Sequence, residues 1–268
     1  MPGGGGCGDV AARGIVYLIG AGPGDPELLT LRGVRLLQQA DAVLYDHLVN
    51  PAILEHARAG AALVDVGKRH GHHSAAQDEI NRMLVDLARR GRTVARLKGG
   101  DPLVFGRGGE ELEALAAHGV RFEVVPGVSA ANGAAAYAGI PLTHRDYCRT
   151  CVLVTGHSRN GRLELDWPAL ARPRQTLVAY MAVATLGEFT SQLLLHGLSA
   201  DTPAAAIERG TTAAQRVVAG TLSTLHRLAS EACVKPPALI VIGEVVKLRR
   251  ALQWFVASAS PADIEEIA

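Results

Sequence analysis

Three glycine-rich clusters give the first indication of chemistry in this sequence. The clusters are Gly20-Ala21-Gly22-Pro23-Gly24-Asp25, Gly99-Gly100-Asp101-Pro102 and Gly106-Arg107-Gly108-Gly109, and the first two directly follow segments that we expect to be strands. Glycine at such positions lets the backbone approach a ligand closely or adopt a positive φ angle. In open α/β sheets, ligands bind beyond the carboxyl ends of the strands. The clusters therefore favour a site for a nucleotide-like ligand.

The first cluster departs from the dinucleotide-binding fingerprint G-x-G-x-x-G. That pattern requires glycine at position 25, where Asp25 stands. Pro23 and Pro26 also interrupt the tight strand-turn-helix entry that the fingerprint needs. On spacing alone, a dinucleotide site, plain tight turns and a ligand loop of another type all stay open.

Two groups of cysteine and histidine residues are weak candidates for metal or redox chemistry. Cys148-Arg149-Thr150-Cys151 is a C-x-x-C motif, but it precedes an expected strand instead of starting a helix, as redox use requires. His70, His72 and His73 are adjacent in sequence, whereas a metal ion needs ligands that converge in space. We therefore predict no metal site.

Composition excludes several classes of protein. The 268 residues include 27 Lys and Arg against 26 Asp and Glu, and this balance disfavours a nucleic-acid partner. No apolar run reaches the roughly 18 residues of a membrane helix, and the glycine-rich N-terminus lacks the pattern of a secretory signal. Four cysteines do not indicate a disulfide framework in a chain of this size. We expect a cytoplasmic protein without a membrane partner.

The first half of the chain alternates short apolar segments with helical patterns. Expected strands cover residues 15–20, 41–45, 63–66, 93–97 and 122–125, and expected helices cover residues 26–40, 74–90 and 108–118. Such alternation predicts an α/β fold with parallel strands.

A second series of the same kind follows. Its expected strands cover residues 151–155, 177–181, 204–208 and 238–243, and its expected helices cover residues 129–138, 186–196 and 221–230. The length also suits two domains. We predict a disordered tail (1–13), an N-terminal α/β domain (14–126) and a C-terminal α/β domain (127–268), with mostly parallel or mixed sheets.

Several ordered segments, taken together, resemble the tetrapyrrole methylase family. They are Val16–Pro26, Leu44–Asp46, Val66–Arg69, Arg96–Glu111, Val125–Ala130 and Gly139–Tyr147. The last three are similar to segments of the uroporphyrinogen-III C-methyltransferases, which use S-adenosylmethionine. The resemblance covers nearly the whole chain. It implies the class III methyltransferase fold, with two α/β domains, a cofactor cleft between them and usually a homodimer.

The resemblance also implies roles for individual residues. It makes Asp46 the proton acceptor and Lys68 the proton donor. The implied cofactor-binding residues are Pro23, Gly99, Gly100, Asp101, Val104, Ser129, Ala130, Met181 and Gly210. Several positions depart from the family pattern, among them His47, which stands where arginine is frequent, and Ala182, which replaces a common glycine.

The implied reaction is C-methylation of uroporphyrinogen III at C-2 and C-7, giving precorrin-2 by way of precorrin-1 for sirohaem or cobalamin. A carboxylate beside the attacked ring can stabilise the cation that forms, or take its proton. The substrate is rich in carboxylates, which arginines recognise well. Candidate substrate-binding residues are Arg69, Arg107, Arg145 and Arg149.

Other functions stay open beside this one. A protein of the same family could methylate a later precorrin intermediate, diphthine or ribosomal RNA. A non-catalytic module could bind the cofactor or a tetrapyrrole without turnover, although Asp46 and Lys68 speak against it. A glycine-loop dehydrogenase is the most distant alternative.

Overall fold

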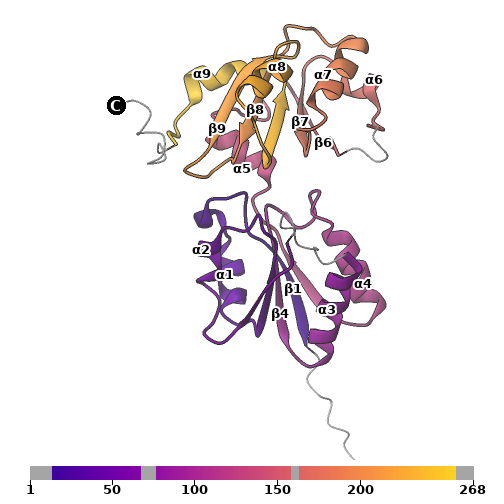
Figure 1. Ribbon diagram of the computed structural model, residues 1–268, viewed down its shortest axis with the longest axis vertical. Coiled ribbons are helices and arrows are strands. Elements are labelled where there is room, and N and C mark those ends of the chain that lie inside the picture. Colours follow the sequence, from indigo (N-terminus) through magenta and orange to yellow (C-terminus); the bar gives the residue numbers. More distant parts are fainter. Residues whose placement is uncertain (1–13, 68–76, 158–162, 258–268) are drawn as a thin grey trace, which may run out of the picture. The chain divides into compact units, whose positions relative to one another are not determined.

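The computed structural model describes residues 14–67, 77–157 and 163–257 of the chain (Figure 1). These residues form two compact units. Unit 1 comprises the described residues up to Gly22 together with Pro26–Gly127, and unit 2 comprises Pro23–Asp25 and the chain from Val128 onward. The sequence-based boundary after residue 126 did not anticipate the small segment Pro23–Asp25, which leaves unit 1 for three residues.

Unit 1 is built on a five-stranded parallel sheet. Its strands are β1 (Ile15–Gly20), β2 (Ala42–Tyr45), β3 (Ala62–Asp65), β4 (Thr93–Lys98) and β5 (Arg121–Val125). Their order in the sheet is β3-β2-β4-β1-β5, and every neighbouring pair is parallel. The predicted parallel α/β sheet is confirmed.

Helices cover both faces of this sheet (Figure 1). They are the 3-10 helix η1 (Pro26–Leu28) and the α-helices α1 (Leu31–Leu37), α2 (Pro51–Leu54), α3 (Gln77–Arg89) and α4 (Gly108–Ala117). Ile19, Val43 and Leu97 pack with residues of α1 and α2 on one face. The alternate positions of the same strands face α3 and α4, where Leu44 and Val94 join a separate apolar cluster.

Unit 2 contains a second five-stranded sheet, with a different strand arrangement. Its strands are β6 (Thr150–Thr155), β7 (Gln175–Tyr180), β8 (Pro203–Glu208), β9 (Arg216–Thr221) and β10 (Ala238–Ile242). In the order β6-β7-β10-β8-β9, only β6 and β7 pair in parallel, and the other pairs are antiparallel. The prediction of mostly parallel or mixed sheets is therefore confirmed, with a parallel sheet in unit 1 and a mixed sheet in unit 2. A loop without a helix joins β8 to β9, so the chain reverses and the two strands pair antiparallel.

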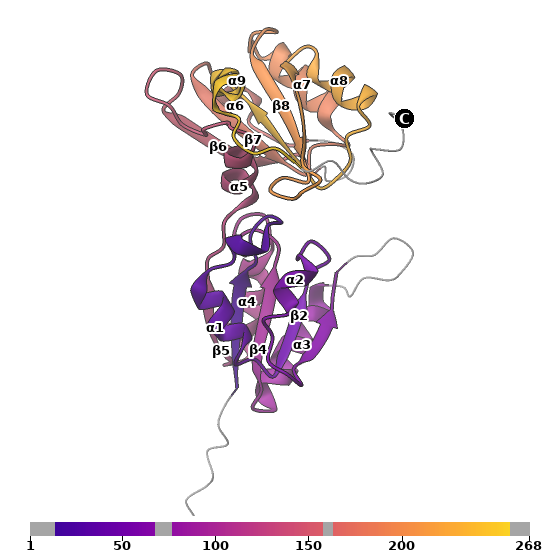
Figure 2. The same cartoon turned by 90° about the vertical axis from the view of Figure 1, so that its left-hand side faces the viewer.

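The sheet of unit 2 also has helices on both faces (Figure 2). They are α5 (Ala130–Tyr137), α6 (Trp167–Leu170), α7 (Leu186–Leu195), α8 (Leu225–Glu231), the 3-10 helix η2 (Glu244–Leu248) and α9 (Arg249–Leu252). Residues of α6, α7 and α8 form one apolar cluster with the sheet. Ala131 and Ala134 of α5 join the cluster on the opposite face. None of the helices that the structure describes combines the length and apolarity needed to cross a membrane.

Two predicted helices begin later than the periodicity suggested. The pattern at residues 26–40 becomes η1 and then α1, because Thr30 is extended and its hydroxyl caps α1 by accepting from the Gly33 amide at 3.0 Å. The helix expected from Thr221 begins only at Leu225. Residues up to Thr221 form β9, whose valines pair with β8, and β-branched side chains favour such a strand.

Candidate active site

Asp46 lies directly after β2, at the carboxyl edge of the parallel sheet of unit 1. The register of β2 and β4 pairs Leu44 with Arg96 and Tyr45 with Leu97. One step further along, Asp46 comes beside Lys98, the last residue of β4. The Asp46 side chain is 27% exposed, so its carboxylate is supported by protein on one side and reaches solvent on the other.

Arg96 and Lys98 lie two residues apart on β4, so their side chains share one face of the sheet. It is the α3/α4 face, because Val94 of the same strand, two residues before Arg96, packs there. Arg96 Nη2 donates to Asp46 Oδ1 at 2.6 Å, whereas Lys98 Nζ lies 3.8 Å from Asp46 Oδ2. The two cationic side chains are almost completely buried, with 2% and 4% exposed. A buried cation requires a nearby carboxylate, so Asp46 and the two cations form one electrostatic unit.

Glu111 completes this unit from the first turn of α4. Its Oε1 accepts hydrogen bonds from Arg96 Nε at 3.1 Å, Lys98 Nζ at 3.0 Å and Gln77 Nε2 at 3.2 Å. The side chain is fully buried. Within the described part of the chain, two carboxylates here balance two cations. We call Asp46, Arg96, Lys98 and Glu111 the buried charge cluster.

Three of these four residues, Arg96, Lys98 and Glu111, were not among the candidates predicted from the sequence. The available signal was the pair of basic residues, Arg96 and Lys98, inside an otherwise apolar strand. Buried charges of this kind require partners, and the first turn of the next helix supplies Glu111.

The predicted cofactor loops of unit 1 lie at the same edge of the sheet. Gly20, Gly100 and Gly127 pack so tightly that a Cβ atom on Gly127 would lie 2.3 Å from the Gly100 carbonyl oxygen. Gly22 and Gly100 exchange backbone hydrogen bonds of 2.7 and 3.2 Å. The glycines after β1, β4 and β5 therefore form one platform, and a side chain at its centre would not fit.

Asp101 fastens this platform instead of pointing freely toward a ligand. Its Oδ2 accepts from the Gly127 amide at 3.0 Å, and its Oδ1 accepts from the Leu103 amide at 2.8 Å. Each carboxylate oxygen retains a further lone pair. Gly99 packs against Leu48 of the loop that follows Asp46. The Gly99–Asp101 loop and the Asp46 loop are therefore neighbours.

In unit 2, the predicted cofactor residues gather around α5. A Cβ atom on Gly133 of α5 would lie 2.4 Å from Pro23 Cγ, and one on Gly210 would lie 2.4 Å from Ala134 Cβ. The small side chains of α5 thus allow both Pro23 and Gly210 to approach. Ser129 caps this helix through its hydroxyl, which accepts from the Asn132 amide at 3.3 Å.

Hydrogen bonds hold the segment Pro23–Asp25 against the rest of unit 2. Tyr137 Oη donates to Asp25 Oδ2 at 2.7 Å, and the Asp25 amide donates to Thr211 Oγ1 at 3.0 Å. Gln215 connects Thr211 with Tyr137, because its side chain accepts a hydrogen bond from the Thr211 amide and donates one to the Tyr137 carbonyl oxygen. Pro23 is therefore held beside α5 and the loop that follows β8.

Met181 follows β7 and its side chain is 52% exposed. The preceding Tyr180 accepts a hydrogen bond from the Ala131 amide at 2.9 Å, which joins the end of β7 to the start of α5. Met181, Arg209 and Thr211 have positive φ angles of 53°, 46° and 69°. Such angles are uncommon outside glycine, so the loops after β7 and β8 contain three unusual backbone positions.

The predicted substrate-binding arginines have different environments. Arg107 forms a two-pronged ion pair with Glu110, with Nε–Oε1 and Nη2–Oε2 distances of 2.9 and 2.6 Å. This hydrogen bond raises the pKa of Arg107 and lowers the pKa of Glu110. Arg145 and Arg149 are exposed residues of unit 2. Lys68 and Arg69 lie outside the described residues.

The structure gives no support to a metal or redox role for the cysteines. Among the described residues, no group of histidine, cysteine or acidic side chains could hold a metal ion. Cys148 is buried and contacts Thr176 Oγ1 at 3.0 Å. Burial, and secondarily the neighbouring Cys148, raises the pKa of Cys151, which disfavours the reactive thiolate. The histidines at 70, 72 and 73 lie outside the described residues.

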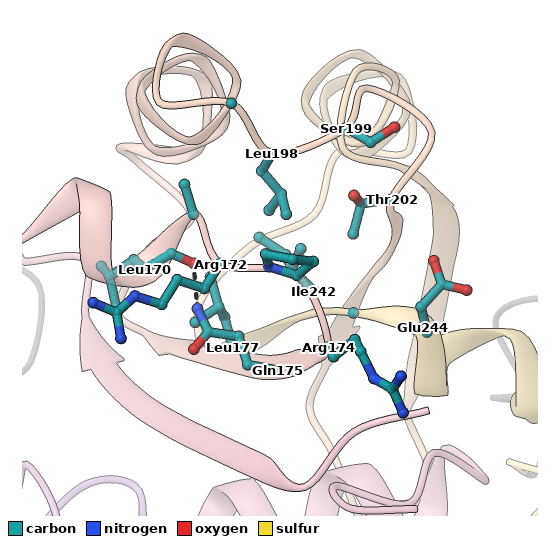
Figure 3. Close-up of a pocket in the computed structure, with 14 residues that line it drawn as sticks. Leu170, Arg172, Arg174, Gln175, Leu177, Leu198, Ser199, Thr202, Ile242 and Glu244 are labelled. Atoms are coloured by element: carbon teal, nitrogen blue, oxygen red, sulfur yellow. Dashed lines mark hydrogen bonds between the residues drawn. The ribbon is translucent and has the colours of Figure 1, made fainter. Parts of the chain in front are cut away.

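One cavity of about 290 Å³ lies elsewhere in unit 2 (Figure 3). It is lined by Gln175 and Leu177 at the amino end of β7, together with Leu198 and Ile242. Tyr180 and Met181 stand at the other end of that strand. This cavity is therefore separate from Met181, a predicted cofactor residue of the same unit.

Comparison with known proteins identifies the family of this chain. The sequence profile of the Tetrapyrrole (Corrin/Porphyrin) Methylases matches residues 15–226. This chain belongs to that family. It is 57% identical over 243 residues to siroheme synthase of Nitrosospira multiformis, and 59% identical over 246 residues to siroheme synthase of Pseudomonas fluorescens. These alignments cover 91% and 92% of this chain but 52% and 53% of the relatives, so the chain spans about half of their length.

Solved structures show the same relationship. The uroporphyrin-III C-methyltransferase of Thermus thermophilus, complexed with S-adenosylhomocysteine, matches with a TM-score of 0.75 and 42% identity. The alignment covers 87% of this chain and 93% of that one. A cobalt precorrin-4 methyltransferase matches with a TM-score of 0.77 and 31% identity, covering 87% of this chain and 95% of the other.

Proposed function

We propose that this chain is an S-adenosylmethionine-dependent C-methyltransferase that converts uroporphyrinogen III to precorrin-2 by methylation at C-2 and C-7. The proposal is supported by family membership, by the siroheme synthases that share more than half of their aligned residues with it, and by the Thermus thermophilus enzyme complexed with S-adenosylhomocysteine, the demethylated form of the donor. The structural observation that carries it is the position of Asp46. Its carboxylate is ion-paired with Arg96, remains partly exposed to solvent and lies in the loop that packs against the Gly99–Asp101 loop.

The residues present suit the methyl donor. We propose that Gly99, Gly100, Asp101 and Val104 of the loop after β4 are contacts of the donor, because glycines leave the backbone accessible to a ligand. We propose the same role for Pro23, Ser129, Ala130, Met181 and Gly210; Ser129 is the N-cap of α5 and Ala130 its first residue. The exposed thioether side chain of Met181 offers an apolar surface for an adenine ring. When bound, the donor supplies an electrophilic methyl carbon on a sulfonium.

Asp46 performs the proton chemistry in this proposal. After a pyrrole carbon has taken the methyl group, the ring is cationic and loses a proton to restore conjugation. Arg96 holds Asp46 Oδ1, so Oδ2 is the oxygen that faces this task. A positioned carboxylate base contributes about 10²–10⁴-fold to a rate. We propose Lys68 as the proton donor. The proposed ligands of the substrate carboxylates are Arg69, Arg107, Arg145 and Arg149.

The mass of the product tests this function. Uroporphyrinogen III and isotopically labelled S-adenosylmethionine are incubated with the protein, and the tetrapyrrole is examined by mass spectrometry. Gain of two labelled methyl groups supports the proposal. Binding of the donor without methylation supports a non-catalytic module instead, and refutes the proposal.

A second candidate has a specific observation in its favour. The cobalt precorrin-4 methyltransferase shares the fold closely, so the same scaffold acts on a later intermediate. The higher identity to the uroporphyrin-III enzyme favours our first choice. Offering both substrate types in separate reactions decides between them.

The whole biological setting is also a proposal. We propose that the chain acts in the cytoplasm as a homodimer and supplies precorrin-2 for sirohaem or cobalamin. The chain corresponds to about half of the siroheme synthase relatives, so the steps after methylation are outside the activity proposed here.

A further inference from the structure

Lys98 is shared unequally between the two carboxylates of the buried charge cluster. Its Nζ lies 3.0 Å from Glu111 Oε1 but 3.8 Å from Asp46 Oδ2. We propose that Glu111 is a positioning residue that holds Lys98 away from Asp46, so that Asp46 Oδ2 stays available to the substrate. This inference deepens the proposed function and rests on it for the role of Asp46.

The hydrogen bonds of Glu111 are concentrated on one oxygen. Oε1 accepts from Arg96, Lys98 and Gln77, whereas the buried Oε2 has no hydrogen-bond partner within the described part of the chain. A buried oxygen without a partner costs free energy. This arrangement directs the charge of Glu111 at the two cations, and it binds Lys98 more closely than Asp46 does.

Glu111 also restrains Arg96. The guanidinium donates through Nε to Glu111 and through Nη2 to Asp46, so two adjacent donors of one rigid group hold the two carboxylates. The fixed guanidinium then orients Asp46 through Oδ1. Glu111 thus acts on both Asp46 oxygens: it orients one through Arg96 and keeps the other open through Lys98.

Removal of the negative charge of Glu111 gives a directional expectation. In Glu111→Gln the side chain keeps its size, but two buried cations then share the single carboxylate of Asp46. Because unpaired buried charge is costly, Lys98 Nζ should move to a direct contact of about 3 Å with Asp46 Oδ2. A crystal structure of Glu111→Gln measures this distance without reference to activity. A Lys98–Asp46 distance unchanged from the wild type would overturn the proposal.

Kinetics provide the second readout. We expect kcat of Glu111→Gln to fall about 10- to 100-fold, because small misplacements of catalytic groups have effects of this size. KM for S-adenosylmethionine should stay within about two-fold, since the glycine platform does not involve Glu111. Glu113→Gln, an exposed position on the same helix, is the matched control. A purely structural role would lower the amount of folded protein without this selective loss of kcat.

A double variant separates restraint of Lys98 from other effects. In Glu111→Gln with Lys98→Met, no ammonium remains to capture Asp46, and one cation again balances one carboxylate. We expect kcat at least about ten-fold above that of Glu111→Gln alone, in line with strong coupling between contacting residues. No recovery would overturn the proposal. If Glu111→Gln alone does not fold, the folded double variant carries the test, and a kcat more than about 100-fold below wild type counts against the restraint.

The outcomes distinguish the two proposals. Wild-type protein that does not methylate any tetrapyrrole refutes the proposed function, while the Lys98–Asp46 distance in Glu111→Gln still decides the inference. Conversely, an inactive Asp46→Asn beside a fully active Glu111→Gln refutes only the inference.

Discussion

Arg96 Nη2 donates a hydrogen bond of 2.6 Å to Asp46 Oδ1 across 50 residues of sequence. The contact joins the buried Arg96, on the central strand β4, to the partly exposed Asp46, in the loop after β2. The Arg96 side chain is buried, so it has little conformational freedom, and its hydrogen bond restricts the orientation of the Asp46 carboxylate. This relationship gives Asp46 a fixed orientation before any substrate arrives, which is the arrangement that a catalytic group requires.

Asp46→Asn should abolish most of the turnover and leave donor binding intact. The amide keeps the oxygen that Arg96 contacts, but it cannot accept a proton. We expect kcat to fall about 10²–10⁴-fold, and the Kd for S-adenosylmethionine to change by less than about two-fold. Steady-state kinetics and calorimetric binding measure the two quantities, with the exposed Asp86→Asn as control. Equal losses of turnover and donor affinity would contradict the assigned role.

Arg96→Met should be strongly destabilising. It leaves the carboxylates of Asp46 and Glu111 with one fewer cation in a buried environment. Breaking such a group typically costs about 3–5 kcal/mol. By contrast, Arg32→Met removes the exposed ion pair with Glu123, which should cost less than about 1 kcal/mol. Urea unfolding of both variants tests the difference, and similar losses would show that the cluster contributes little to stability.

Tyr137→Phe should weaken binding of the methyl donor. The substitution removes the 2.7 Å hydrogen bond to Asp25 that holds the Pro23–Asp25 segment beside α5. A hydrogen bond to a charged group contributes about 1.5–3 kcal/mol, so we expect the Kd for S-adenosylmethionine to rise by roughly ten-fold or more. Calorimetric titration measures the change, and Tyr17→Phe in β1 serves as the control. An unchanged Kd would mean that this segment does not position the donor.

Cys151 should react slowly with alkylating reagents. Burial raises the pKa of its thiol, so less thiolate is present at a given pH than for an ordinary cysteine. At about pH 8 we expect iodoacetamide to modify the exposed Cys233 well before Cys151, and raising the pH to speed the reaction of Cys151. Peptide mass spectrometry follows each site. Faster labelling of Cys151 would revive a redox interpretation of the C-x-x-C motif.

Much of the first unit could be read from the sequence. Apolar strands alternating with helices indicate a parallel sheet, and the glycines after β1 and β4 mark its carboxyl edge. These features are local, since a strand or a turn depends mainly on residues that are close in the chain. The family resemblance also proposes Asp46 as a catalytic residue, and the structure places it directly after β2.

Other features were beyond sequence reasoning because they depend on pairing between distant segments. No local sequence pattern predicted that β8, β9 and β10 pair antiparallel, because the alternation of side chains along a strand is the same in both strand directions. The departure of Pro23–Asp25 from unit 1 likewise depends on Tyr137 and Thr211, which lie more than a hundred residues away.

The sequence by itself determined the parallel α/β unit, the glycine loops at the ends of its strands and the family to which the chain belongs. Only the tertiary structure decided that Arg96, Lys98 and Glu111 gather behind Asp46. The physical reason is that burial, which the fold alone sets, turns ordinary charged residues into obligatory partners. In sequence, Glu111 is one acidic residue at the start of a helix; in the fold, it is the carboxylate that holds two buried cations.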